Sequence, residues 1–190
     1  MMREIEITRG RFTVFARVLG EPQAPALLYL QGGPGFPAPR QRFEWVSHAL
    51  ERGYQVVLLD QRGTGRSTRI DSATPELIRT DVLASLRADE IVADAEALRE
   101  EMGLDRWDVL GQSFGGFCLM HYLAAHPDSV GRALFTGGVP SIGEGADEVY
   151  RATFAKLKRR HLQFNEAYPA AEAMVREVCR HLEAQEELLP

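Results

Sequence analysis

A serine between two glycines is the residue of this chain best suited to covalent chemistry. Residues 111–115 read Gly-Gln-Ser-Phe-Gly, which matches the pattern G-x-S-x-G. A strand-like apolar run, Trp107–Leu110, precedes the motif, and a helical pattern, Phe114–Ala125, follows it. A sharp strand-to-helix turn exposes such a serine at a helix N-terminus, where the partial positive charge favours developing negative charge. We therefore predict Ser113 as a nucleophile; the alternative is a glycine-rich turn with a serine N-cap.

A second glycine-rich loop follows the apolar run Ala26–Leu30. Residues 31–35 read Gln-Gly-Gly-Pro-Gly. An oxyanion hole needs backbone N–H groups aimed at the tetrahedral oxygen, one from the residue after the nucleophile and one from the loop after an earlier strand. Phe114 and Gly33 are our candidates for these two donors, because Pro34 has no N–H. The alternative is a Pro/Gly turn with no role in binding.

A third glycine-rich segment, residues 60–67, follows the apolar run Val56–Leu59 and reads Asp-Gln-Arg-Gly-Thr-Gly-Arg-Ser. Its G-x-G could begin a dinucleotide-binding fingerprint. The third glycine of that fingerprint would fall at Thr68, however, and no helical pattern begins there. We interpret the segment as a structural turn near the mouth of the site, with Asp60 and Arg62 fixing the loop.

The elements that would position these loops alternate between strand and helix. Short apolar runs typical of strands covered on both faces occupy Ala26–Leu30, Val56–Leu59, Trp107–Leu110 and Ala133–Phe135. Helical patterns lie between them, at Glu44–Arg52, Ala88–Met102 and Phe114–Ala125. Two alternating segments, Glu4–Thr8 and Arg11–Arg17, predict an antiparallel pair at the start. The fold class predicted is α/β, with a doubly wound, mostly parallel sheet.

Two of the predicted helices differ in pattern. In Ala88–Met102 the apolar residues share one face, and Asp89, Asp94, Glu96 and Glu100 lie off it. The helix Phe114–Ala125 is nearly all apolar, which predicts that it is buried. After Pro140 no strand-like run appears, and two amphipathic helical patterns follow.

Composition excludes several classes of protein. The chain has 190 residues, 45% of them hydrophobic and 26% charged, which is typical of an ordinary soluble globular protein. The net charge of -5 and the lack of a basic block argue against nucleic-acid and membrane partners. The N-terminus is polar, and no apolar run is long enough for a membrane span. Two cysteines form neither a disulfide framework nor a metal cluster, so we expect a cytoplasmic location.

Taken together, QGGPG, DQRGTGRS and GQSFGG resemble the motifs of the proline iminopeptidases, in that order and at these spacings. These enzymes are serine peptidases of the α/β-hydrolase fold that remove an N-terminal proline. The resemblance covers residues 26–140, and the family usually shows His where this chain has Gln31. It implies that Ser113 is the nucleophile, that Gly33 and Phe114 donate to the oxyanion, and that the substrate is a peptide with an N-terminal proline. It implies no metal and no organic cofactor.

The rest of a catalytic triad is harder to find. In this fold the acid and the histidine follow the serine on loops after later strands, and only one strand-like run follows Ser113. His121 would lie about 12 Å along the serine's own helix, at 1.5 Å per residue, and His126 at its far end. His161 and His181 lie in charged helical stretches, where a solvated histidine is the usual interpretation.

We therefore expect the acid and the base to lie beyond the last residue of this chain. Residues 1–140 are then the N-terminal part of an α/β-hydrolase domain, and residues 141–190 begin a helical cap. Alone, the 190 residues are expected to be inactive and to associate through an open sheet edge, as a homo-oligomer or an aggregate. Two alternatives remain open: a serine esterase or amidase of the same fold, and a catalytically inactive fragment that binds a partner.

Overall fold

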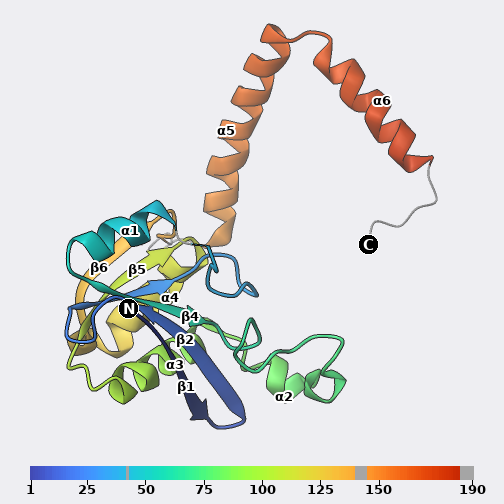
Figure 1. Cartoon of the computed structure of the whole chain (residues 1–190). Helices are drawn as coiled ribbons and strands as arrows, with labels where there is room; N and C mark the ends of the chain where they lie inside the picture. The colour runs from blue at the N-terminus through green and yellow to red at the C-terminus, as the bar shows by residue number, and fades with distance from the viewer. Residues whose placement is uncertain (42, 140–144, 185–190) are drawn as a thin grey trace. The chain divides into compact units, whose positions relative to one another are not determined.

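Six strands form a single mixed sheet in the computed structural model, which describes residues 1–41, 43–139 and 145–184 (Figure 1). The strands are β1 (Met2–Arg9), β2 (Phe12–Leu19), β3 (Ala26–Leu30), β4 (Gln55–Asp60), β5 (Trp107–Gln112) and β6 (Val130–Thr136). Their order across the sheet is β1-β2-β4-β3-β5-β6. The pairs β1–β2 and β2–β4 are antiparallel, whereas β4, β3, β5 and β6 are mutually parallel. The predicted fold class, a mostly parallel α/β sheet, is confirmed.

Helices fill the connections between the parallel strands. They are α1 (Glu44–Glu51), α2 (Thr80–Leu83), α3 (Ala88–Glu101) and α4 (Phe114–Ala125), with 3-10 turns at Pro75–Leu77 and Pro127–Ser129. The first, third and fourth begin at the residues that the sequence predicts. The short α2 and the two 3-10 turns were not predicted, because segments of three or four residues carry no helical periodicity.

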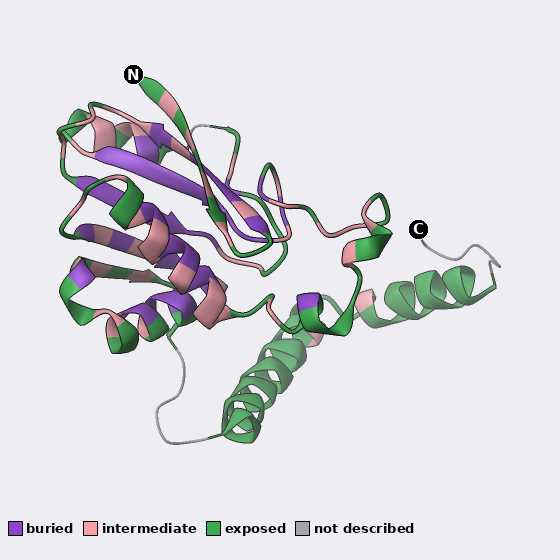
Figure 2. Cartoon of the chain, turned by 90° about the horizontal axis from the view of Figure 1, so that it is seen from below, coloured by how far each residue is buried: buried purple, intermediate pink, exposed green. Residues whose placement is uncertain are grey.

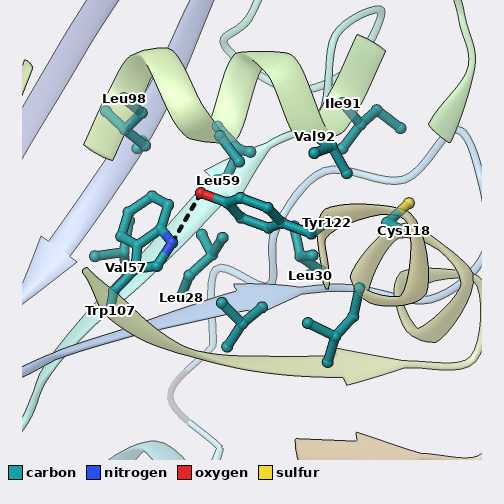
Figure 3. Close-up of a cluster of buried hydrophobic side chains, with 14 of the residues drawn as sticks. Leu28, Leu30, Val57, Leu59, Ile91, Val92, Leu98, Trp107, Cys118 and Tyr122 are labelled. Carbon is teal, nitrogen blue, oxygen red and sulfur yellow. Dashed lines mark hydrogen bonds between the residues drawn. The ribbon is translucent and has the colours of Figure 1, made fainter. Parts of the chain in front are cut away.

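Successive residues of each central strand face opposite layers of helices. Leu28 and Leu30 belong to the larger core cluster, which packs the sheet against α3 and α4. Tyr29, between them, belongs to a second cluster on the α1 side, where its ring lies 4.9 Å from that of Trp45. Figure 3 shows the larger cluster, in which the indole of Trp107 donates a 3.0 Å hydrogen bond to Tyr122 Oη. The sheet is therefore covered on both faces, as in doubly wound folds.

Two of the four acidic residues predicted to lie off the apolar face of α3, Asp94 and Glu96, are largely enclosed. Asp94 is 1% exposed and accepts two hydrogen bonds from Arg62, at 2.7 and 2.5 Å. Glu96 accepts hydrogen bonds from Tyr122 Oη at 2.6 Å and Ser129 Oγ at 2.8 Å. The loop after β4 contacts Asp94, and α4 with the turn after it contacts Glu96, whereas the side chain of Glu100 stays exposed.

Burial and hydrogen bonding act in opposite directions on the Glu96 carboxyl. Burial raises its pKa, but hydrogen bonds from Arg99, Tyr122 and Ser129 outweigh burial and lower the pKa to about 2. Glu96 thereby links α3 to α4 as a carboxylate.

Helix α4 is buried on one face only. Cys118, Leu119 and Tyr122 are fully buried, whereas Phe117 is 48% exposed. The prediction that the whole helix is buried is therefore wrong. Its apolar composition marked an interior helix, but only the residues that face the sheet and α3 are covered.

The chain divides into two units, residues 1–140 and 141–190. The described part of the second unit consists of α5 (Ala146–Ala167) and α6 (Ala171–Glu183), and none of the described residues of these helices is buried (Figure 2). Apolar side chains such as Phe154, Val175 and Leu182 are among those exposed. The predicted domain boundary falls at residues outside the described ranges, and the assignment of this unit to a cap stays a prediction.

Candidate active site

Ser113 stands at the turn between β5 and α4 in a strained conformation. Strand β5 ends at Gln112, α4 begins at Phe114, and Ser113 between them has φ 51° and ψ −117°. Among the described residues it is the one non-glycine with a positive φ. Its N–H donates to Thr136 O at 2.9 Å, and its carbonyl accepts from Gly116 N–H at 2.9 Å. Backbone strain of this kind costs about 1–3 kcal/mol and persists where neighbouring contacts hold it.

Gly115, two residues after the serine, allows α4 to cross the end of β3 in direct contact. A Cβ added at Gly115 would lie 1.8 Å from Leu30 O. A Cβ at Gly111 would lie 2.6 Å from Gly115 O. Both glycines of the G-x-S-x-G pattern are thus required by backbone packing, and this is the physical reason why the spacing predicts the turn.

The loop after β3 lies against the serine. A Cβ added at Gly32 would lie 2.7 Å from Ser113 Cβ and 3.5 Å from Ser113 Oγ. Gly32, Gly33 and Ser113 line the same open depression of about 400 Å³, together with Tyr29, Gln31, Phe36, Pro37, Pro39, Phe43 and Gln112. Ser113 and the predicted donor Gly33 are therefore brought to one place.

Phe114, the other predicted donor, directly follows the serine. It lines a separate cavity of about 340 Å³ with Gly35 and Thr64, among other residues. The assignment of Gly33 and Phe114 as oxyanion donors stays a prediction, and within the loop after β3 it is Gly32 that lies against Ser113.

The loop after β4 is fixed as the sequence predicts. Asp60 is fully buried, and its carboxylate accepts hydrogen bonds from Ala38 N–H at 2.9 Å and Arg66 N–H at 2.8 Å. Arg40 pairs with the same carboxylate. Arg62 is held by Asp94 on α3. Asp60 and Arg62 therefore join this loop to the segment after Gly32 and to α3, respectively.

Sequence reasoning missed the contribution of the last residue of β6 and of the segment that follows it. Thr136 O accepts the N–H of Ser113, and a Cβ added at Gly138 would lie 1.9 Å from Ser113 O. The glycine pair that follows the predicted strand Ala133–Phe135 was the available signal.

In the described residues no hydrogen bond joins Ser113 Oγ to a histidine or a carboxylate. His126 Nδ1 lies 4.0 Å from Glu96 Oε1, at the far end of α4. His121 is exposed on the same helix, and His161 and His181 lie on α5 and α6 of the second unit. The first unit therefore holds a positioned serine and a glycine loop, without a base bonded to the serine in the described residues.

The buried thiol of Cys118, possible metal ligands and possible membrane-spanning helices were the remaining candidates for function. Cys118 is fully buried, and burial raises the pKa of its thiol to about 12, which makes it a poor nucleophile. The described residues hold no cluster of three or more His, Cys, Asp or Glu suited to a metal ion. No helix in the described ranges is long and apolar enough to cross a membrane.

A mostly parallel sheet, a strained serine between strand and helix, and a glycine loop against that serine are features of the α/β-hydrolase fold. Residues 25–178 match the family with the alpha/beta hydrolase fold. The chain belongs to this family.

Among curated proteins the chain is similar to proline iminopeptidases. It is 44% identical to the proline iminopeptidase of Aeromonas sobria, over 94% of this chain and 44% of the relative. It is 35% identical to a proline iminopeptidase of Aspergillus aculeatus, over 91% of this chain and 43% of the relative. The resemblance to proline iminopeptidases is thus confirmed, and the chain spans less than half the length of these relatives.

Solved structures of other proteins share the fold of this chain. A proline iminopeptidase-related protein from Thermus thermophilus matches with a TM-score of 0.53 and 27% identity, over 71% of this chain and 44% of that one. A 2-hydroxy-6-oxo-6-phenylhexa-2,4-dienoate hydrolase from Rhodococcus matches with a TM-score of 0.59 and 23% identity, over 77% of this chain and 50% of that one. The second likeness shows the fold alone.

Proposed function

We propose that this chain carries the nucleophile and the oxyanion loop of a serine aminopeptidase that releases N-terminal proline from peptides. The observation that carries the proposal is Ser113, strained at the strand-to-helix turn and held against Gly32. The 44% identity to a proline iminopeptidase supports the choice of substrate. A serine esterase or amidase of the same fold is the alternative outcome of the test below.

In the proposed reaction Ser113 Oγ attacks the carbonyl carbon of the N-terminal proline, and its proton passes to a base. The N–H groups of Gly33 and Phe114 stabilise the oxyanion. The C–N bond then breaks, the base returns the proton to the departing amine, and an ester joins the proline to Ser113. Water, activated by the same base, attacks that ester, releases free proline and restores the serine hydroxyl.

The base and the acid of this proposal come from residues outside this chain. Two observations support that part: the described residues place no histidine on Ser113, and the relatives are more than twice as long as the matched segment. Without a base, a serine hydroxyl is a weak nucleophile. The 190-residue chain alone is then expected to hydrolyse a proline arylamide no faster than background.

The test compares this chain with the longest natural polypeptide that contains it. The longer protein should release arylamine from a proline arylamide, and Ser113→Ala should lower kcat by several orders of magnitude, because triad members act as a unit. A fluorophosphonate should label Ser113 alone. Hydrolysis of short esters without hydrolysis of the proline arylamide would favour the esterase, and undiminished turnover by the alanine variant would exclude Ser113 as the nucleophile.

We also propose a cytoplasmic location and a peptide substrate as the partner of this chain. Both cysteines are free thiols, Cys118 buried and Cys179 exposed, which is the usual state in a reducing compartment. Fractionation of the source cells with an antibody to this chain tests the location.

A further inference from the structure

The side chain of Gln31 is a buried polar group at the start of the candidate oxyanion loop. Gln31 directly follows β3 and directly precedes Gly32, and it is 4% exposed. Its amide nitrogen donates two hydrogen bonds, each of 3.1 Å, to Phe36 O and Leu59 O. One acceptor lies at the far end of the same loop, and the other lies on the neighbouring strand β4.

These two bonds close the loop and attach it to the sheet. The segment between Gln31 and Phe36 contains three glycines, two of which have positive φ: 61° at Gly33 and 93° at Gly35. Glycine backbone is conformationally free, so such a loop needs contacts from elsewhere to hold one shape. The Gln31 amide supplies them from inside the protein.

A second glutamine reinforces the arrangement from the end of β4. Gln61 Nε2 donates to Gln31 O at 3.3 Å, and Thr64 Oγ1 donates to Gln61 O at 2.7 Å. The loops after β3 and β4 are thereby joined through main-chain carbonyls that are buried with their partners. In each of the two glutamines the amide donates, while Oε1 is buried without a hydrogen-bond partner in the described residues.

We propose that Gln31 is a positioning residue, which holds Gly32 and Gly33 in the geometry that receives the oxyanion. The proposal rests on the proposed function for its kinetic part and on the hydrogen bonds of Gln31 for its structural part. Few side chains can make both of these hydrogen bonds. Two carbonyl oxygens require two N–H donors on one neutral, buried group, and the glutamine amide provides both.

Other side chains of similar size supply fewer neutral N–H donors than the glutamine amide. Methionine is close in length and neutral but has no donor. A neutral imidazole has one N–H, so Gln31→His satisfies one carbonyl at high pH and both only as the imidazolium. A variant with histidine should therefore acquire a titration that the natural glutamine does not have.

The experiment uses Gln31→Met and Gln31→His in the longest natural polypeptide, with Gln55→Met as the matched control. Gln55 is also fully buried, and its amide donates to Pro22 O at 3.1 Å and Ala24 O at 2.7 Å. It begins β4, whereas the candidate site lies where the parallel strands end. Both methionine variants should lower the melting temperature, but only Gln31→Met should lower kcat, by about 10–100-fold with little change in KM, as expected for a displacement approaching 1 Å.

Gln31→His should show kcat that rises as pH falls through the imidazole pKa, against the wild-type profile measured in parallel. Equal kcat for wild type and Gln31→Met, or equal losses in Gln31→Met and Gln55→Met, would overturn the kinetic part.

A structural measurement separates this inference from the proposed function. In crystal structures of the two variants, the backbone of Gly32 and Gly33 should be displaced from Ser113 by about 1 Å in Gln31→Met and should keep its wild-type position in Gln55→Met. If the wild type does not hydrolyse proline arylamides, the proposed function fails while the position of the loop still decides the role of Gln31. An undisplaced loop in Gln31→Met would refute the positioning role whatever the activity.

Discussion

Replacing Gly32 by alanine should remove most of the activity while leaving the fold intact. The added Cβ would lie 2.7 Å from Ser113 Cβ and 3.0 Å from Gln112 O. Carbon atoms in favourable contact are about 3.5–4.0 Å apart, so the loop and the serine must separate by about 1 Å. The residues that would have to move are the nucleophile and its own strand, which are fixed by backbone hydrogen bonds.

The magnitude follows from that displacement. A misplacement of about 1 Å at the reacting centre costs on the order of 10²-fold in rate, which corresponds to about 2.7 kcal/mol in the activation free energy. We expect kcat of Gly32→Ala for a proline arylamide to fall by this factor in the longest natural polypeptide. Labelling by a fluorophosphonate should slow in parallel, because it depends on the same serine and the same loop.

The control is Gly145→Ala. Gly145 has an ordinary φ of −73°, and a Cβ there would meet no atom within 4 Å. This variant carries the same change of composition without the contact, and its kcat should equal that of the wild type. A Gly32→Ala enzyme with kcat within twofold of the wild type would show that the loop is free to move away, and that its contact with Ser113 does not govern the reaction.

Three further outcomes are expected. Gly115→Ala should strongly destabilise the first unit in urea unfolding, because its Cβ would lie 1.8 Å from Leu30 O; wild-type stability would contradict the crossing of α4 over β3. The pKa of Glu96 is about 2 in the fold against 4.5 as reference, so the stabilisation by its carboxylate is complete above pH 4.5 and is lost as pH falls toward 2. Between pH 6 and 3 the wild type should lose roughly 2 kcal/mol more unfolding free energy than Glu96→Gln, and parallel pH profiles would refute this role. Leu134→Lys, on the edge strand β6, should reduce self-association of the 190-residue chain in light scattering; an unchanged mass distribution would argue against association through this edge.

The sequence predicted the strand-to-helix turn at Ser113 because such a turn depends on the spacing of neighbouring residues. A strand, a sharp turn and a helix must follow one another within a few residues, and glycines are needed where α4 passes Leu30. The parallel strands were predictable for a similar reason, because strands that are covered on both faces have short, almost continuously apolar sequences. Local steric requirements therefore produce sequence patterns from which these elements can be predicted.

Long-range pairings left no such pattern. The helical pattern placed Asp94 off the apolar face of α3. Its partner Arg62 lies 32 residues earlier in the chain, so the pattern of the helix could not indicate that Asp94 is buried. The contacts of Ser113 with Thr136 and Gly138 likewise join segments whose proximity depends on the pairing of β5 with β6. Helical periodicity cannot reveal a partner that arrives from another element.

The glycine loop shows a subtler limit. Its glycines are equivalent in sequence, and Gly33 was preferred on the ground that proline lacks an N–H. The structure places Gly32 against Ser113 and Gly33 in the same depression, and it shows that the preceding side chain, Gln31, closes the loop, whereas the choice of Gly33 as donor stays a prediction. A motif thus identifies a loop, whereas the choice among its residues depends on how that loop meets its neighbours.

Ser113, the proposed nucleophile, and its surroundings are held without any contact from a base in the described residues. The strain at Ser113 is held by Thr136 and Gly116 through main-chain bonds, and the glycine loop is held by Gln31 and the loop after β4. All of these partners lie in the first unit. Positioning of the serine and activation of the serine are therefore separate tasks in this chain. Under the proposed function, residues that supply the base would add proton transfer to a site whose geometry these contacts already hold.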